Sequence, residues 1–171
     1  EQGAATGVSL DDGTRIGGRE IIVAAGALQS PAILMRAGIG DAAELRQLGI
    51  AVVVDRPGVG RNLQEHPSIA MSAWIKPHAR MGATPRRHVQ MALRYSSALP
   101  ETPPNDMFTV VVAKSAWHPL GVRIGTLYSW INKPYSGGRV RLVSAAPADY
   151  PDVAFELLSD RRDFVRMRDC V

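Results

Sequence analysis

An apolar run of β-branched residues, followed by small residues and then by Ser-Pro, constrains most strongly what this chain can fold into. Residues 20–25 read Glu-Ile-Ile-Val-Ala-Ala. They show no polar alternation and predict a strand buried on both faces of a parallel sheet. Gly26 ends the run, and Ser30 followed by Pro31 has the residue types of a helix N-cap and first turn. This helix is expected to end at Gly38.

A second helix and a returning strand are expected next. Asp41, with Glu44 three residues later, predicts a capped helix start, and Gly49 predicts the helix end. Residues 51–54, Ala-Val-Val-Val, predict the following strand. Upstream, Asp-Asp-Gly at residues 11–13 lies between two short runs and predicts a hairpin turn. The first third of the chain is therefore predicted to have α/β character.

The pattern changes near His66, after an irregular segment at residues 62–67. The strands predicted beyond this point are residues 68–75, 107–113, 122–131 and 139–143. Residues 86–96 predict a short helix. Asp160 is expected to cap a last helix. The expected apolar side of that helix consists of Phe164, Val165, Met167 and Val171. The predicted fold class is α/β followed by an α+β region with a mainly antiparallel sheet.

Composition narrows the class of protein. The 171 residues are 46% hydrophobic and 21% charged, as in ordinary globular domains. The net charge of +4 is not gathered into a nucleic-acid stripe, because Asp160 and Asp163 are interleaved with Arg161 and Arg162. No nucleic-acid partner and no membrane span are expected, since no apolar run approaches about 20 residues. Cys170 is the single cysteine, which excludes an intrachain disulfide and permits a reducing, cytoplasmic setting.

The sequence contains none of the common catalytic motifs that would indicate an activity. The sequence contains no GxGxxG dinucleotide turn, no P-loop and no GxSxG elbow. The histidines are His66, His78, His88 and His118. None shows the spacing that would place two metal ligands on one helix face, so structural or surface roles are expected and no metal site is predicted.

Longer stretches resemble the glucose–methanol–choline (GMC) oxidoreductases. Residues 26–40, GALQSPAILMRAGIG, match that family's second signature, with Ala37 where the family has Ser. Residues 58–66, GVGRNLQEH, resemble its GVGxNLQDH run, with Glu65 in place of the usual Asp. Similarity to the substrate domain of bacterial choline and alcohol dehydrogenase-like members is carried by residues 137–142 and 160–168.

The resemblance implies FAD as cofactor and a small-molecule alcohol as substrate, which gives hydride to the flavin and leaves as an aldehyde or ketone. Residues 1–66 would be part of a Rossmann-like FAD-binding domain, and residues 67–171 part of a substrate-binding domain. A small-residue turn before a helix N-terminus allows an anionic cofactor to approach the backbone closely. The residues expected to contact the cofactor are Ala25, Gly26, Ala27, Ser30, Asn62 and His66.

The family's N-terminal dinucleotide turn and C-terminal proton-accepting histidine have no counterpart in this sequence. No catalytic residue is therefore predicted, and the isolated chain is expected to be an inactive fragment. The missing initiator Met at Glu1 and the interrupted last helix at Val171 predict that neither end is natural. Tyr128 and Trp130 are expected either to line the substrate cavity or to pack in the core.

A different class of function stays open. The chain could be a non-catalytic binding or assembly module, or one half of a split flavoenzyme that needs the remainder of the enzyme or a second copy. Such a chain would expose an apolar seam and associate in solution. A monodisperse monomer would argue against it.

Overall fold

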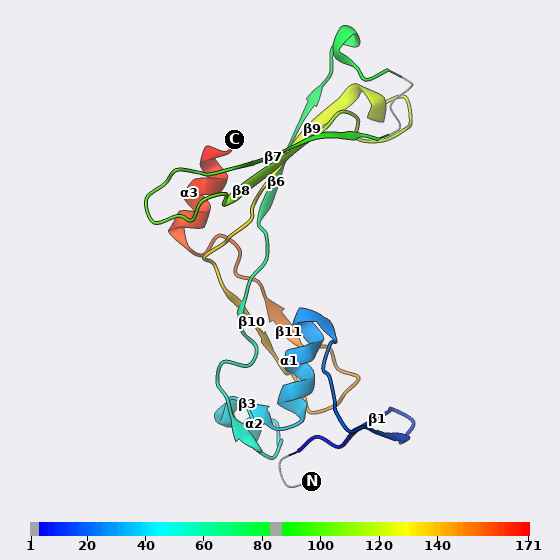
Figure 1. Ribbon diagram of the computed structural model, residues 1–171, viewed down its shortest axis with the longest axis vertical. Helices are drawn as coiled ribbons and strands as arrows, with labels where there is room; N and C mark the ends of the chain where they lie inside the picture. Colours follow the sequence, from blue (N-terminus) through cyan, green and yellow to red (C-terminus); the bar gives the residue numbers. More distant parts are fainter. Residues whose placement is uncertain (1–3, 83–86) are drawn as a thin grey trace. The chain divides into compact units, whose positions relative to one another are not determined.

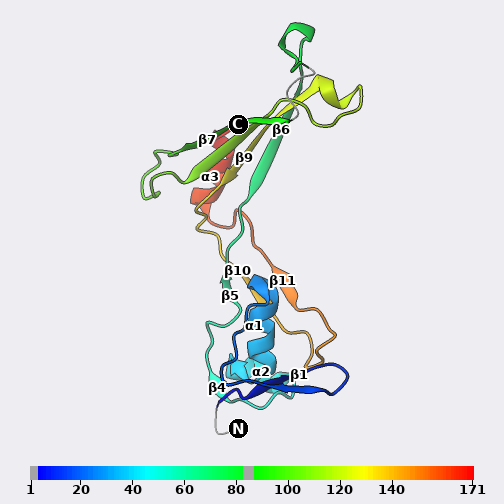
Figure 2. The same cartoon turned by 45° about the vertical axis from the view of Figure 1, so that its right-hand side comes forward.

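The computed structural model describes residues 4–82 and 87–171. The chain divides into two compact units, each built from two stretches of sequence. The first unit combines residues 1–63 with 138–155, and the second combines residues 64–137 with 156–171. Figures 1 and 2 show the elements of each unit in two views.

The first unit begins with the predicted hairpin. Strands β1 (Gly7–Ser9) and β2 (Arg15–Gly17) pair antiparallel, with Val8 opposite Ile16. Gly13 in the turn has a φ of +83°, a conformation that glycine adopts without steric cost. The Asp-Gly turn prediction is confirmed.

The prediction of a strand over residues 20–25 is wrong. Residues 20–24 have no regular structure, and Ile22 is 79% exposed. A strand needs a neighbour to satisfy its backbone N–H and C=O groups. Within residues 4–82 and 87–171 no strand pairs with this run, so its apolar composition is not sufficient to make it a strand.

Two helices and a short parallel pair follow. Helix α1 (Gly26–Arg36) ends before Gly38 as predicted, and helix α2 (Ala42–Gln47) is capped by Asp41. The Asp41 carboxylate accepts the N–H groups of Ala43 and Glu44 at 2.9 and 3.2 Å. Strands β3 (Ile39–Gly40) and β4 (Val54–Asp55) pair parallel. Of the strand expected at residues 51–54, only Val54 therefore lies in a strand.

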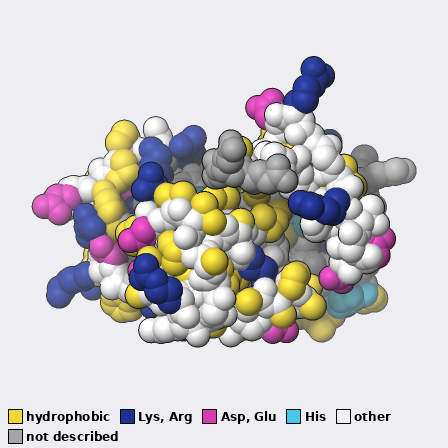
Figure 3. Space-filling model, turned by 90° about the horizontal axis from the view of Figure 1, so that it is seen from below, with side chains coloured by type: hydrophobic (Ala, Val, Ile, Leu, Met, Phe, Trp, Pro, Cys, Tyr) yellow, Lys and Arg dark blue, Asp and Glu magenta, His cyan; other side chains and the backbone are white. Residues whose placement is uncertain are grey.

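A three-stranded antiparallel sheet completes the first unit. Its order is β11 (Asp152–Ala154), β10 (Gly138–Arg141) and β5 (Arg61–Leu63). The buried core between the helices and this sheet is formed by Met35, Leu45, Leu63 and Val140. The face drawn in Figure 3 carries exposed hydrophobic side chains between charged ones of both signs.

The second unit is built on a four-stranded antiparallel sheet. Its order is β6 (Ser68–Trp74), β9 (Ile124–Ile131), β8 (Met107–Val112) and β7 (Val89–Tyr95). Short 3₁₀ turns η1 (Pro77–Ala79) and η2 (Gly121–Arg123) lie in its connections. The strands predicted over residues 68–75, 107–113 and 122–131 are confirmed.

The helix predicted over residues 86–96 is wrong, because residues 89–95 form strand β7; Arg86 lies outside the described residues. The apolar residues Val89, Met91 and Leu93 alternate with Gln90, Ala92 and Arg94 at the period of a strand. Antiparallel pairing with β8 provides the backbone hydrogen bonds that a helix would otherwise supply internally.

Helix α3 (Arg161–Asp169) packs on the sheet through Met167, which contacts the cluster of Met107 and Ile131. Its N-cap at Asp160 is confirmed. Its predicted apolar side is confirmed only for Met167, which is buried, and Val165, which is half-buried. Phe164 is 54% exposed and Val171 is 69% exposed, whereas Asp163 and Arg166 are buried.

Candidate functional site

The turn before α1 offers free backbone N–H groups. Ala25 is the N-cap of the helix and its side chain provides no cap, and the first turn contains no acidic residue. Ala25, Gly26 and Ala27 are all exposed. The first N–H groups of a helix and the positive end of its dipole attract anions. A phosphate group can therefore be bound at this turn.

Gly26 keeps the approach to the turn open. Its φ is +83°, and a Cβ atom built on it would meet no other atom within 4 Å. The glycine is therefore needed for its backbone conformation, and the space beside it is free. Both properties match the close approach expected from the sequence.

Ser30 is not the N-cap that its residue type predicts. The helix begins four residues earlier, at Gly26, so Ser30 and Pro31 lie inside it. The Ser30 hydroxyl instead accepts the N–H of Ala25 at 3.0 Å. Ser30 thus stabilises the turn, because it satisfies a backbone donor that the start of the helix leaves without a partner.

Asn62 occupies a β-bulge on β5. Leu63 pairs with Gly138 and Arg61 pairs with Arg139, so Asn62 is the extra residue between them. Its φ is +55°, a conformation that Asn tolerates better than most residues. The neighbouring Arg61 is bound to Glu44 of α2 at 2.6 Å. The bulge is therefore anchored on one side while the Asn62 side chain is exposed.

His66 lies at the start of the second unit. Its Nδ1 is 2.8 Å from the carbonyl oxygen of Ile131, which can only accept, so Nδ1 carries the proton and donates it. Within the described part of the chain, no partner is found for Nε2. The ring borders an open groove of about 350 Å³. The groove is lined by Gln64, Glu65, His66, Asn132, Lys133 and Pro134.

The structure thus brings four of the six expected residues together, at the start of α1: Ala25, Gly26, Ala27 and Ser30. Asn62 lies in the same unit on β5, and His66 belongs to the other unit. A hollow of about 670 Å³ in the first unit is lined by none of the six.

An aromatic face on the sheet of the second unit was only partly foreseen. Tyr128 and Trp130 lie on one face of β9, two residues apart, and Phe108 lies across from Trp130 on β8. The Phe108 and Trp130 ring centroids are 4.6 Å apart, and those of Tyr128 and Trp130 are 5.6 Å apart. The Tyr128 hydroxyl is 2.8 Å from that of Ser68. Successive side chains of a strand point to opposite faces, so the strand predicted over residues 107–113 could have placed Phe108 on the face opposite Met107.

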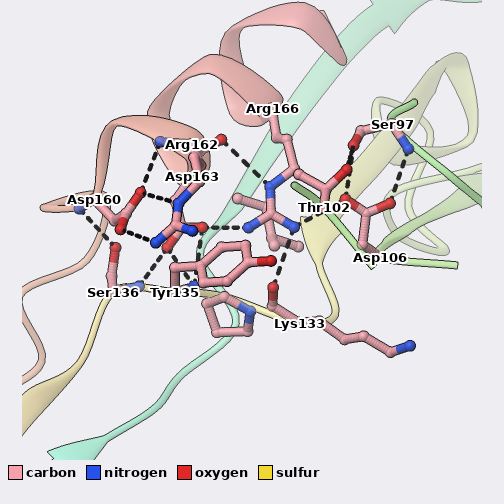
Figure 4. Close-up of polar contacts among 12 residues, drawn as sticks. Ser97, Thr102, Asp106, Lys133, Tyr135, Ser136, Asp160, Arg162, Asp163 and Arg166 are labelled. Atoms are coloured by element: carbon pink, nitrogen blue, oxygen red, sulfur yellow. Dashed lines mark hydrogen bonds and ion pairs between the residues drawn. The ribbon is translucent and has the colours of Figure 1, made fainter. Parts of the chain in front are cut away.

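The opposite face of the sheet carries α3, held by a buried polar network (Figure 4). Arg166 Nη1 lies 2.9 Å from Asp106 Oδ2 and 3.1 Å from the carbonyl oxygen of Lys133. Arg166 Nη2 also donates to Asp163. The three charged side chains are completely buried. This network holds the helix in place, and Arg166 also lines a small pocket of about 100 Å³.

Hydrogen bonds keep the buried carboxylates ionised. Burial alone would raise the pKa of Asp106, but bonds from Ser97 and Arg166 outweigh it and lower that pKa. The pKa of Asp163 is lowered in the same way, by bonds from Ser136, Tyr135 and Arg166 that outweigh burial. The spacing of three residues places Asp163 beside Arg166 on the helix, but nothing in the sequence shows that Asp106, 60 residues away, meets them.

Other kinds of site find no support in the described residues. Among residues 4–82 and 87–171, no three His, Cys, Asp or Glu side chains lie close enough together to hold a metal ion. Burial raises the pKa of the Cys170 thiol, which makes it a poor nucleophile. None of the described helices has the length and apolar character to cross a membrane.

The fold of the chain matches part of a solved oxidase. The structure superposes on Aspergillus oryzae formate oxidase, in a structure that concerns FAD modification, with a TM-score of 0.78 and 20% identity. The match covers 98% of this chain and 39% of that one. At this level of identity the likeness shows only that the chain has the fold of the corresponding part of that oxidase.

Sequence comparison identifies the family. Residues 1–68 match the family model described as GMC oxidoreductase. The chain is 46% identical over 172 residues to 5-(hydroxymethyl)furfural oxidase of Methylovorus sp., covering 96% of this chain and 31% of that protein. It is 31% identical over 202 residues to the oxygen-dependent choline dehydrogenase of Sinorhizobium fredii, covering all of this chain and 36% of that protein. The chain belongs to the GMC oxidoreductase family, and it spans about a third of the length of these relatives.

Proposed function

We propose that this chain is the middle part of an FAD-dependent oxidoreductase that oxidises a small primary alcohol to an aldehyde. The observation that carries the proposal is the uncapped, exposed N-terminus of α1 beside Gly26, where an anionic cofactor can approach the backbone. The 46% identity to a 5-(hydroxymethyl)furfural oxidase supports the reaction class. When bound, FAD would supply the hydride acceptor.

The residues at the turn fit the cofactor in a specific way. The N–H groups after Ala25 would donate to a phosphate oxygen, and Gly26 would leave room for it. Ser30 would hold the turn in the open geometry through its bond to Ala25. Asn62 and His66 would belong to a segment that covers the cofactor, with the His66 ring oriented by the Ile131 carbonyl. Residues 1–66 would then form part of the cofactor domain and residues 67–171 part of the substrate domain.

The aromatic face would contribute to substrate binding. Phe108, Tyr128 and Trp130 present stacked rings, and the paired hydroxyls of Ser68 and Tyr128 lie beside them. Flat π-rich rings pack well against aromatic side chains. A furan alcohol such as 5-(hydroxymethyl)furfural is therefore the first substrate to test.

Choline is the second candidate. A quaternary ammonium also binds favourably over aromatic rings, and a relative with 31% identity is named for choline. The face carries no carboxylate among its described residues, so an uncharged alcohol is favoured.

The test compares the isolated chain with the complete product of its gene. The complete protein is expected to carry bound flavin and to oxidise 5-(hydroxymethyl)furfural faster than choline, with either oxygen or a dye as acceptor. The isolated chain is expected to be inactive. A complete protein that binds no flavin would overturn the proposal. A complete product no longer than this chain that forms a stable dimer or complex would instead favour an assembly module or a split enzyme.

A further inference from the structure

One end of the second unit's sheet is strongly basic. There β6 and β8 end and β7 and β9 begin, at the end away from the contact of α3 with Met107 and Ile131 (Figure 1). We define this basic end by residues Trp74, Lys76, Arg80, Arg87, Lys114, Trp117, Leu120 and Arg123.

The basic end has no acidic residue to balance it. The sequence contains no Asp or Glu at residues 66–100 or at residues 107–148. At the α3 end of the same sheet, by contrast, Arg162 is paired with Asp160 and Arg166 with Asp106. Over the described ranges, no cation of the basic end forms an ion pair with a carboxylate. Lys76, Arg87 and Arg123 are exposed, so their positive charge is available to an external anion, whereas Lys114 is buried.

Exposed tryptophans lie among these cations. Trp74 is 56% exposed, and the guanidinium carbons of Arg80 and Arg123 lie 5.9 and 5.8 Å from its ring centroid. Trp117 is 61% exposed, and Lys114 Nζ lies 3.4 Å from its ring centroid. Indole rings held beside cations at an exposed end combine an apolar body with a positively charged rim.

An apolar residue completes the surface. Leu120, in the loop that follows Trp117, is 54% exposed. Against a nucleic-acid duplex an exposed leucine and two tryptophans would have no phosphate to contact. At the headgroup level of a bilayer, tryptophan is the favoured aromatic residue and an apolar side chain can reach the acyl boundary.

We propose that the basic end docks on the surface of a membrane that contains anionic lipids. The cations are attracted to the lipid headgroups, while Trp117 and Leu120 enter the interface. Each cation near such a surface contributes about 1 kcal/mol, which is about fivefold in binding. This interaction needs no membrane-spanning helix and does not rest on the proposed oxidation chemistry.

The test is co-sedimentation of the complete protein with vesicles of phosphatidylcholine, with and without phosphatidylglycerol. Binding is expected only with phosphatidylglycerol and should weaken as salt is added. The Lys76→Gln/Arg123→Gln variant should bind about 25-fold more weakly, at about fivefold per cation removed. The control variant Arg46→Gln/Arg161→Gln removes the same charge from exposed helix positions elsewhere and should bind as the parent does.

Trp117→Ala separates membrane docking from simple charge attraction. It leaves the charge unchanged and should still weaken vesicle binding severalfold. The proposal is overturned if the complete protein does not sediment with anionic vesicles at low salt. It is also overturned if both double variants lose vesicle binding equally. A third contrary outcome is that Trp117→Ala binds vesicles as the parent does while the parent binds duplex DNA as tightly as it binds anionic vesicles.

Discussion

Arg166 on α3 and Asp106 at the start of β8 form an ion pair that is sealed from solvent: Nη1 lies 2.9 Å from Oδ2, and both side chains are fully buried. The pair joins two segments that are 60 residues apart in the sequence. Asp163 shares the same guanidinium, and its carboxylate also accepts the N–H groups of Tyr135 and Ser136 (Figure 4). Helix α3 is therefore attached to the sheet by charge as much as by its one buried methionine.

Removing one partner of this pair should destabilise the second unit strongly. Asp106→Ala leaves the Arg166 guanidinium short of a buried partner, so we expect a loss of about 3–5 kcal/mol in the free energy of unfolding. Asp152→Ala breaks the exposed Arg141–Asp152 pair, at 2.8 Å, and should cost less than about 1 kcal/mol. Urea unfolding of both variants measures the difference, and equal losses would contradict a special role for the buried pair.

The stability of the second unit should fall in acid. The side-chain bond from Arg162, together with the Arg162 N–H, lowers the pKa of Asp160 from 3.8 to about 2. The pKa values of Asp106 and Asp163 are lowered as well. A carboxyl whose pKa is lower in the folded state stabilises that state above its unfolded pKa, and this stabilisation is lost as the pH falls through the folded pKa.

We therefore expect little change in the stability of the second unit above about pH 5 and a decline from about pH 4 toward pH 2. Urea midpoints measured across this range test it. Asp160→Asn should make the decline shallower, because one of the titrating groups is removed. A decline of the same steepness in this variant would show that Asp160 takes no part.

Two helix-ending glycines provide a matched pair. Gly38 has a φ of +85°, and a Cβ atom there would collide with the Ala51 carbonyl oxygen and lie 2.9 Å from Val53 Cγ2. Gly49 has a φ of +71° with no other atom within 4 Å of a Cβ. Gly49→Ala should cost about 1–2 kcal/mol from backbone strain alone. Gly38→Ala should cost about 1–3 kcal/mol more, because the collision adds to the strain. Thermal unfolding compares them, and identical costs would exclude the collision.

Flavin content tests the α1 turn. Gly26 and Gly13 both have a φ of +83° and open space around a Cβ atom. Gly26→Val and Gly13→Val therefore impose similar backbone strain, but only Gly26→Val places a side chain at the proposed cofactor turn. In the complete protein, flavin absorbance per protein should fall for Gly26→Val and stay near the parent value for Gly13→Val. Equal flavin content in the two variants would contradict the assignment of this turn to the cofactor site.

Local signals predicted the elements whose ends are marked by side chains. The Asp-Gly turn of the first hairpin, the Asp41 and Asp160 caps and the glycine after α1 all lie where expected. Each of these signals acts within a few residues, so no distant contact is needed to make it work. The alternation of Val89, Met91 and Leu93 also carried the information for β7, although a helix was expected there.

Pairing and burial could not be predicted in the same way. Residues 20–25 have the composition of a buried strand and yet form none, because no described strand lies beside them. Ser30 has the residue type of an N-cap and instead bonds back to Ala25 from inside the helix. The assignment of Asn62 and His66 to the cofactor, and the boundary near His66 between two functional domains, stay predictions.

The sequence by itself determined the family, the positions of the caps and turns, and most strands of the second unit, because these depend on neighbouring residues and on long motif matches. Only the tertiary structure decided which face of α3 is buried. The apolar Phe164 of the helix is exposed, while Asp163, Arg166 and Met167 are buried. Charged side chains can be buried only where partners satisfy them, and some of these partners come from distant segments. Asp106 and the backbone at Tyr135 are such partners, and the fold alone brings them to the helix.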